Sequence, residues 1–124
     1  MHTNESAENY LETILILSKS HPVVRSVDVA AELGFKKSSV SVAMKNLREK
    51  KHIKVDEQGF IHLTPSGLEI ANMIYERHTL LSSWLIHLGV PADVAAADAC
   101  KMEHVISKES FEAIKRHVYE NKEV

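Results

Sequence analysis

Apolar residues recur with a helical period through the first third of the chain. Residues 7–17 place their apolar side chains every three or four positions, which predicts an amphipathic helix. A second helix is expected over residues 26–33, with the Ser26 hydroxyl as its N-cap. Gly34 follows the last apolar position, and a glycine there supplies the left-handed conformation that commonly ends a helix.

Two short strand-like runs follow a third predicted helix. This helix is expected to be capped by Ser38 or Ser39 and to continue through Lys50. The runs 53–55 and 60–63 are rich in strand-forming residues and flank a glycine-containing turn, which is typical of a hairpin. Two helices joined by a turn with glycine form a helix-turn-helix, and the added hairpin predicts a winged helix.

The second half of the chain has only helical patterns. Thr64 is the expected N-cap of a helix that has Pro65 at its first position and continues to Gly89. Two more helices are expected over 91–105 and, capped by Ser107, over 108–119.

The predicted fold is therefore mostly α, with two domains. Residues 1–63 form an N-terminal winged helix-turn-helix DNA-binding domain, and residues 64–124 form a helical dimerisation domain. A helix of about 24 residues is long for a globular domain and usually contacts a partner subunit. The apolar surface of the last three helices exceeds what one small domain can cover, so we expect a constitutive homodimer.

Charge is distributed unevenly although its sum is close to zero. Seventeen acidic and fifteen basic residues give a net charge of −2, which excludes a histone-like polycation. Residues 36–54 nevertheless hold seven basic residues and one acid, Glu49. The N-terminal end of a recognition helix contacts base edges and phosphates in the major groove of double-stranded DNA. The candidate DNA-binding residues at that end are Lys36, Lys37, Ser38, Ser39, Ser41, Val42 and Lys45.

Cysteine content and hydropathy indicate the compartment. The single cysteine, Cys100, excludes an intramolecular disulfide framework and fits a reducing environment. No apolar run approaches the roughly 18 residues of a membrane span, and the polar, acidic N-terminus does not read as a secretory signal. We therefore expect a soluble, cytoplasmic protein that does not act at a membrane.

A cluster of potential metal ligands lies on the fifth predicted helix. Cys100, Glu103 and His104 have the spacing i, i+3 and i+4, so they share one helix face. A thiolate, a carboxylate and an imidazole can chelate one divalent ion if further ligands come from elsewhere. The remaining candidates are Asn9 and Glu12 on the first helix and His78 on the long helix.

At this point the sequence resembles the iron- or manganese-dependent repressors typified by the diphtheria toxin repressor and the manganese transport regulator. The resemblance covers nearly the whole chain, and its most specific part is the run Cys-x-x-Glu-His-x-x-Ser after the long helix. The matching segments are Ala7-Glu8-Asn9-Tyr10-Leu11-Glu12, Ser38-Ser39-Val40-Ser41, Leu63-Thr64-Pro65-Ser66-Gly67, Arg77-His78-Thr79-Leu80-Leu81 and Asp98-Ala99-Cys100-Lys101-Met102-Glu103-His104-Val105-Ile106-Ser107.

The resemblance implies a metal ligand set position by position. Cys100, Glu103 and His104 fall on the family's ligands of the fifth helix, where cysteine is the iron-type choice and manganese regulators have glutamate. Glu12 and His78 fall on ligands of the manganese-type binuclear site. Asn9 departs from the family, which has aspartate or methionine there, and a neutral amide oxygen is a weaker ligand than a carboxylate.

The predicted function is a homodimeric, metal-activated repressor that binds a palindromic operator and controls metal-ion homeostasis genes. Fe(II) is the expected ion because of the thiolate, Mn(II) is the alternative, and other divalent transition metals should bind in vitro. We expect no enzymatic activity and no small organic substrate. Two alternatives use the same residues: a redox-sensing winged-helix regulator with Cys100 as its thiol, which lacks a resolving cysteine, and a metal-dependent hydrolase, for which no nucleophile–base pair is evident.

Overall fold

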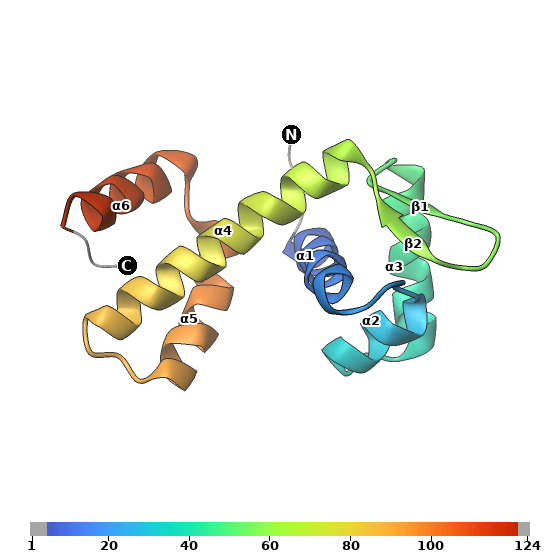
Figure 1. Cartoon of the computed structure of the whole chain (residues 1–124), viewed down its shortest axis with the longest axis horizontal. Coiled ribbons are helices and arrows are strands. Elements are labelled where there is room, and N and C mark those ends of the chain that lie inside the picture. Colours follow the sequence, from blue (N-terminus) through green and yellow to red (C-terminus); the bar gives the residue numbers. More distant parts are fainter. Residues whose placement is uncertain (1–4, 122–124) are drawn as a thin grey trace. The chain divides into compact units, whose positions relative to one another are not determined.

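The computed structural model describes residues 5–121 of the chain, and Figure 1 shows the order of its elements. The outer ends of both predicted domains, residues 1–4 and 122–124, lie outside the described part. Within that part there are six helices and one antiparallel pair of strands, as a mostly α winged-helix fold requires. The elements are α1 (Glu5–Ser20), α2 (Ser26–Leu33), α3 (Lys37–Glu49), β1 (Ile53–Val55), β2 (Ile61–Leu63), α4 (Pro65–His87), α5 (Ala92–Val105) and α6 (Lys108–Glu120).

The chain forms two compact units, Met1–Asn72 and Met73–Val124, which divide within α4. The first unit holds the helix-turn-helix and the wing. Its core is formed by apolar residues from α1, α2, α3 and β1 that are almost completely inaccessible to solvent. The most buried of them are Leu11, Ile14, Val29, Val40 and Ile53.

The turn between α2 and α3 forms as predicted at Gly34 but not at the serines. Gly34 has a left-handed backbone (φ 68°), and its N–H donates to the carbonyl of Ala30. The predicted N-cap of α2 is wrong, because the cap is Arg25, whose N–H donates to the Asp28 carboxylate at 2.9 Å. Ser26 is thereby already inside the helix.

The predicted cap of α3 is also wrong by two or three residues. Lys36 is the N-cap, its side chain makes no capping hydrogen bond, and the helix begins at Lys37. The N–H of Phe35 donates to the carbonyl of Ala30 at 3.1 Å and closes the preceding turn, so the chain enters α3 before Ser38. At α2 the Asp28 carboxylate makes the capping contact in place of a serine, and at α3 the helix begins directly after the turn that ends α2.

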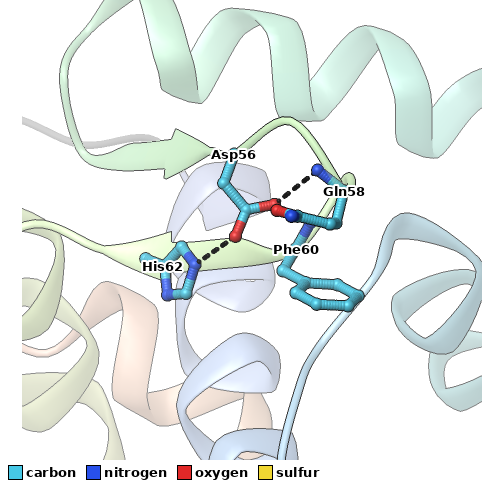
Figure 2. Close-up of polar contacts among 4 residues, drawn as sticks. All are labelled: Asp56, Gln58, Phe60 and His62. Atoms are coloured by element: carbon cyan, nitrogen blue, oxygen red, sulfur yellow. Dashed lines mark hydrogen bonds and ion pairs between the residues drawn. The ribbon is translucent and has the colours of Figure 1, made fainter.

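The wing is a short hairpin organised by one carboxylate. β1 and β2 pair with Lys54 opposite His62. Figure 2 shows the Asp56 carboxylate accepting hydrogen bonds from the backbone N–H groups of Gln58 (3.0 Å) and Phe60 (2.9 Å) and pairing with His62 Nε2 at 3.0 Å. Phe60 was expected to begin the second strand, but its N–H is held by Asp56 and it lies in the turn.

We expect the order of the wing to depend on pH through Asp56. The pKa of its carboxyl is lowered chiefly by the hydrogen bond from His62 and then by the N–H of Phe60. A carboxyl with a lowered pKa stabilises the folded form above its unfolded pKa, about 3.9, and this contribution is lost as the pH falls through the folded value. We expect the amide resonances of Gln58 and Phe60 to move together in an NMR titration below about pH 4.

The control for this titration is the Asp56→Asn variant, in which the amide oxygen still accepts a hydrogen bond but does not titrate. Its Gln58 and Phe60 resonances should show no joint acid transition. A transition of unchanged midpoint in this variant would mean that another group controls the wing.

The segment that follows α3 is held closely to the start of α4. Thr64 caps α4 as predicted, because its Oγ1 accepts from the N–H of Gly67 at 3.2 Å. The same hydroxyl donates to the carbonyl of Lys51 at 2.7 Å. The His52 carbonyl occupies the space that a Cβ at position 67 would need, so only glycine fits there. The Thr-Pro-Ser-Gly segment therefore fixes the connection that follows the recognition helix.

The second unit contains the end of α4 together with α5 and α6. Its core joins Leu80 and Leu81 of α4 to Ala99 of α5 and to Phe111 and Val118 of α6. Ser107 caps α6 as predicted, since its side chain accepts from the N–H of Ser110. α4 ends two residues earlier than predicted, at His87. None of the helices in residues 5–121 is both long and apolar enough to cross a membrane.

Candidate metal centre and nucleic-acid interface

The predicted DNA-contacting residues all lie at the surface of the first unit. α3 is anchored by its buried side chains Val40, Met44 and Leu47. Most positions between these anchors face solvent, and Val42 is 60% exposed although it is apolar. The exposed set is the whole predicted group: Lys36, Lys37, Ser38, Ser39, Ser41, Val42 and Lys45. Helical spacing therefore separates an apolar face, which fixes the helix, from a basic face with hydroxyl groups that is open to a ligand.

The centre of the candidate metal site is the carboxylate of Glu103 in the second unit. Glu103 is 0% exposed on α5. Its Oε2 lies 3.0 Å from Nδ1 of His78 on α4, and its Oε1 lies 3.4 Å from Nε2 of His104, the next residue. The His104 side chain is 3% exposed, whereas that of His78 is 33% exposed. Within the second unit, the structure thus brings together the predicted ligands His78, Glu103 and His104.

This arrangement suits a cation better than it suits a packed core. A buried carboxylate is costly unless it is paired and hydrogen-bonded. Apart from the two imidazoles at ion-pair distance, neither oxygen of Glu103 has a hydrogen-bond partner among residues 5–121. Two imidazole nitrogens and a carboxylate are ligands that first-row divalent transition metals accept. The residues present therefore fit a bound divalent ion.

The other three predicted ligands are one residue of α5 and two residues of α1. Cys100 is exposed on α5, one turn before Glu103, and is not part of a disulfide. Glu12 is buried and Asn9 is half-buried on α1, in the first compact unit. The i, i+3 spacing of Asn9 and Glu12 is retained because α1 is continuous from Glu5 to Ser20.

Arg77 is a residue of this centre that the sequence interpretation missed. It is 9% exposed, and its Nη1 donates to the backbone carbonyls of Glu103 (3.1 Å) and Ile106 (2.9 Å). The available signal was its position in α4, three residues after Ile74 and four before Leu81, both fully buried. A charged residue on the buried stripe of a helix requires a partner, and here the partner is the end of α5.

Two family models together match almost the whole chain. The model described as the N-terminal DNA-binding domain of iron-dependent repressors matches residues 2–65, and the model described as their metal-binding and dimerisation domain matches residues 64–123. The chain belongs to the iron-dependent repressor family. This confirms the resemblance inferred from the sequence motifs and places Glu103 and both imidazoles in the metal-binding part.

Individual relatives and solved structures agree with the family assignment. The transcriptional regulator MntR of Salmonella typhimurium is 34% identical over 90% of this chain and 71% of its own length. The regulator MntR of Listeria welshimeri is 31% identical over 88% of this chain and 77% of its own length. The structure of the manganese regulator SloR superimposes with a TM-score of 0.81 at 27% identity, over 96% of this chain.

A manganese-dependent transcriptional repressor solved in complex with manganese matches with a TM-score of 0.82 at 27% identity, over 90% of this chain. The chain spans about half the length of these two solved proteins (55% and 52%). The family consists of metal-dependent transcriptional regulators and not of enzymes, which confirms the prediction that this chain is not an enzyme.

Proposed function

We propose that this chain is a metal-activated, homodimeric repressor that binds operator DNA and controls metal-ion homeostasis genes. The observation that carries the proposal is the buried Glu103 carboxylate between the imidazoles of His78 and His104. The basic face of α3 supplies the DNA contacts in this proposal, and Lys36, Lys37 and Lys45 neutralise phosphates. As a regulator of transcription, the protein would act in the cytoplasm.

The ligand set is completed, in this proposal, by Cys100 and by the α1 residues Asn9 and Glu12. This part is supported by the family resemblance and by the residue types. A bound divalent ion would offset the negative charges of Glu12, Glu103 and a Cys100 thiolate. If the arrangement that gathers these ligands is also the one that DNA prefers, metal and DNA must raise each other's affinity.

The identity of the metal is proposed from two opposing observations. The relatives include regulators named for manganese, which favours Mn(II). Cys100 is a soft ligand that favours Fe(II), the ion that the sequence alone suggests. We therefore propose that the site binds both ions, with Cys100 raising the affinity for Fe(II) relative to Mn(II).

The dimer and the operator follow from symmetry. The dimerisation part contains exposed apolar side chains, among them Ile86, Leu88, Val94 and Val105, which a second copy would cover. The two-fold axis of such a dimer requires a palindromic operator with half-sites about one helical turn apart.

The experiment that tests the function is a DNA-binding titration of the full chain. Fluorescence anisotropy of a labelled palindromic duplex, selected from random sequence in the presence of metal, is measured with Mn(II), with Fe(II) under anaerobic conditions, or with chelator. We expect either metal to raise the affinity by roughly 5- to 150-fold, the usual range of allosteric coupling. Metal-independent binding would contradict the proposal.

The Cys100→Ser variant separates the two metals and the redox alternative in the same assay. It should lose more of its response to Fe(II) than to Mn(II), because only the softer ion loses a preferred ligand. A redox regulator would instead lose its response to oxidant and show none to Mn(II) under reducing conditions.

A further inference from the structure

Arg77 links every segment that carries a proposed ligand in the second unit. It directly precedes His78 on α4. It donates from one nitrogen to the carbonyl of Glu103, which is itself a proposed ligand, and to the carbonyl of Ile106, just past the end of α5. Its guanidinium also lies over the ring of Phe111 on α6, 5.4 Å from the ring centre. One side chain therefore contacts the ends of two helices from a third.

The chemistry of this contact is that of a helix C-terminus. The last carbonyls of a helix have no partner within the helix and carry partial negative charge, so a buried cation is favourable there. The two acceptors of Arg77 are carbonyls of this type, 26 and 29 residues away in the sequence. The aromatic face of Phe111 adds a cation–π contact that does not require a further acceptor.

The geometry of the arginine also fixes a distance. The planar guanidinium, held by two carbonyls, sets the position of the α5 backbone that bears Glu103 and His104 relative to the α4 backbone that bears His78. The side chains that these two backbones carry approach each other to 3.0 Å, from His78 Nδ1 to Glu103 Oε2. Burial of the charge is costly, because Nε of Arg77 has no hydrogen-bond partner among the described residues. A methionine of similar length would fill the space without that cost.

We propose that Arg77 is a positioning residue of the metal centre: it holds the Glu103–His104 turn at the spacing from His78 at which one divalent ion is chelated. The inference rests on the proposed function, since it takes His78, Glu103 and His104 as ligands. Arg77 itself is not a ligand, because a guanidinium has no lone pair to donate.

The test measures metal binding directly, apart from DNA. Mn(II) affinity is measured by calorimetry and the ligand field of bound Co(II) by visible absorption, for wild type, Arg77→Met and Arg77→Lys. We expect about a 10- to 100-fold loss of Mn(II) affinity and altered Co(II) bands in Arg77→Met, the range found when groups that orient metal ligands are removed. Arg77→Lys keeps the positive charge but lacks the planar guanidinium that donates to two carbonyls. It should therefore recover part of the Mn(II) affinity.

A core variant separates positioning from stability. Val118 is fully buried on α6 and does not bear a ligand, so Val118→Ala should lower the thermal midpoint and leave Mn(II) affinity and Co(II) bands unchanged. The proposal is overturned if Arg77→Met binds Mn(II) as wild type does, or if Val118→Ala loses affinity equally. If Arg77→Met does not fold, wild-type affinity and bands in Arg77→Lys overturn it. A wild type that binds no metal would overturn the proposed function as well.

Discussion

Replacing Glu103 with glutamine should abolish metal-stimulated DNA binding and should not unfold the protein. The substitution keeps the shape of the side chain and removes the buried charge between His78 and His104. A neutral amide is a much weaker ligand for a divalent ion than a carboxylate, so the metal-bound state loses its central contact. We expect operator affinity in saturating Mn(II) to fall to the level of the metal-free wild type, a loss of roughly 5- to 150-fold.

The Glu103→Gln substitution should also affect the stability of the protein. Without metal, the Glu103 carboxylate is a buried charge whose oxygens have no hydrogen-bond partner within residues 5–121 other than the imidazoles beside them. A buried charge carries a large desolvation penalty, and a neutral amide of the same shape carries a smaller one. The metal-free Glu103→Gln protein should therefore have a thermal midpoint equal to or above that of wild type, and Mn(II) should no longer raise it.

The matched control is Glu109→Gln, which removes one negative charge from an exposed position on α6 of the same unit. It should retain the full metal response in both assays. His104→Ala tests the site from the imidazole side and should also lose the response, with the dimer retained in sedimentation. If Glu103→Gln and His104→Ala both bind operator in a metal-dependent way, the site has been assigned to the wrong residues.

The elements that the sequence predicted correctly are those determined by local chemistry. Gly34 ends α2 because the end of the helix requires a left-handed backbone, which glycine adopts easily. Thr64 and Ser107 cap helices through hydrogen bonds that span three residues. The closeness of Glu103 and His104 could likewise be predicted, because both residues belong to one turn of a helix. Such features need no knowledge of the tertiary structure.

The features that were missed depend on competition or on distant contacts. Ser26 is a good N-cap by residue type. Arg25 takes that position instead, and its N–H donates to the Asp28 carboxylate. The partners of Arg77 could not be read from the sequence, because its acceptors are backbone carbonyls, which any residue type provides. Residue identity alone therefore shows which groups can chelate a metal, and the structure adds which group holds them in place.

The largest effect on the DNA side should come from the double substitution Lys36→Ala/Lys37→Ala. Both lysines are exposed at the N-terminal end of α3, where a recognition helix approaches the duplex. Each lysine that neutralises a phosphate releases a counterion, which lowers the slope of log affinity against log salt by about 0.9. Losing both should flatten that slope by nearly 2 and weaken binding to operator and unrelated DNA alike.

Val42→Ala is the informative contrast to this double variant. Val42 is exposed on the same helix and carries no charge, so its contribution would be apolar contact with a thymine methyl group. Its replacement should reduce discrimination between operator and mutated operator while the salt slope stays unchanged. Lys108→Ala/Arg116→Ala removes two exposed positive charges from α6 and controls for net charge.

These variants also test whether the metal centre and the DNA face are separate sites joined by linkage. The Lys36→Ala/Lys37→Ala protein should bind Mn(II) without DNA as tightly as wild type, since neither lysine is a ligand. Its remaining DNA binding should still increase with Mn(II) by the wild-type factor, because the coupling belongs to the equilibrium between arrangements and not to either lysine. Unchanged DNA affinity and salt slope in this variant would place the DNA-binding surface away from the start of α3.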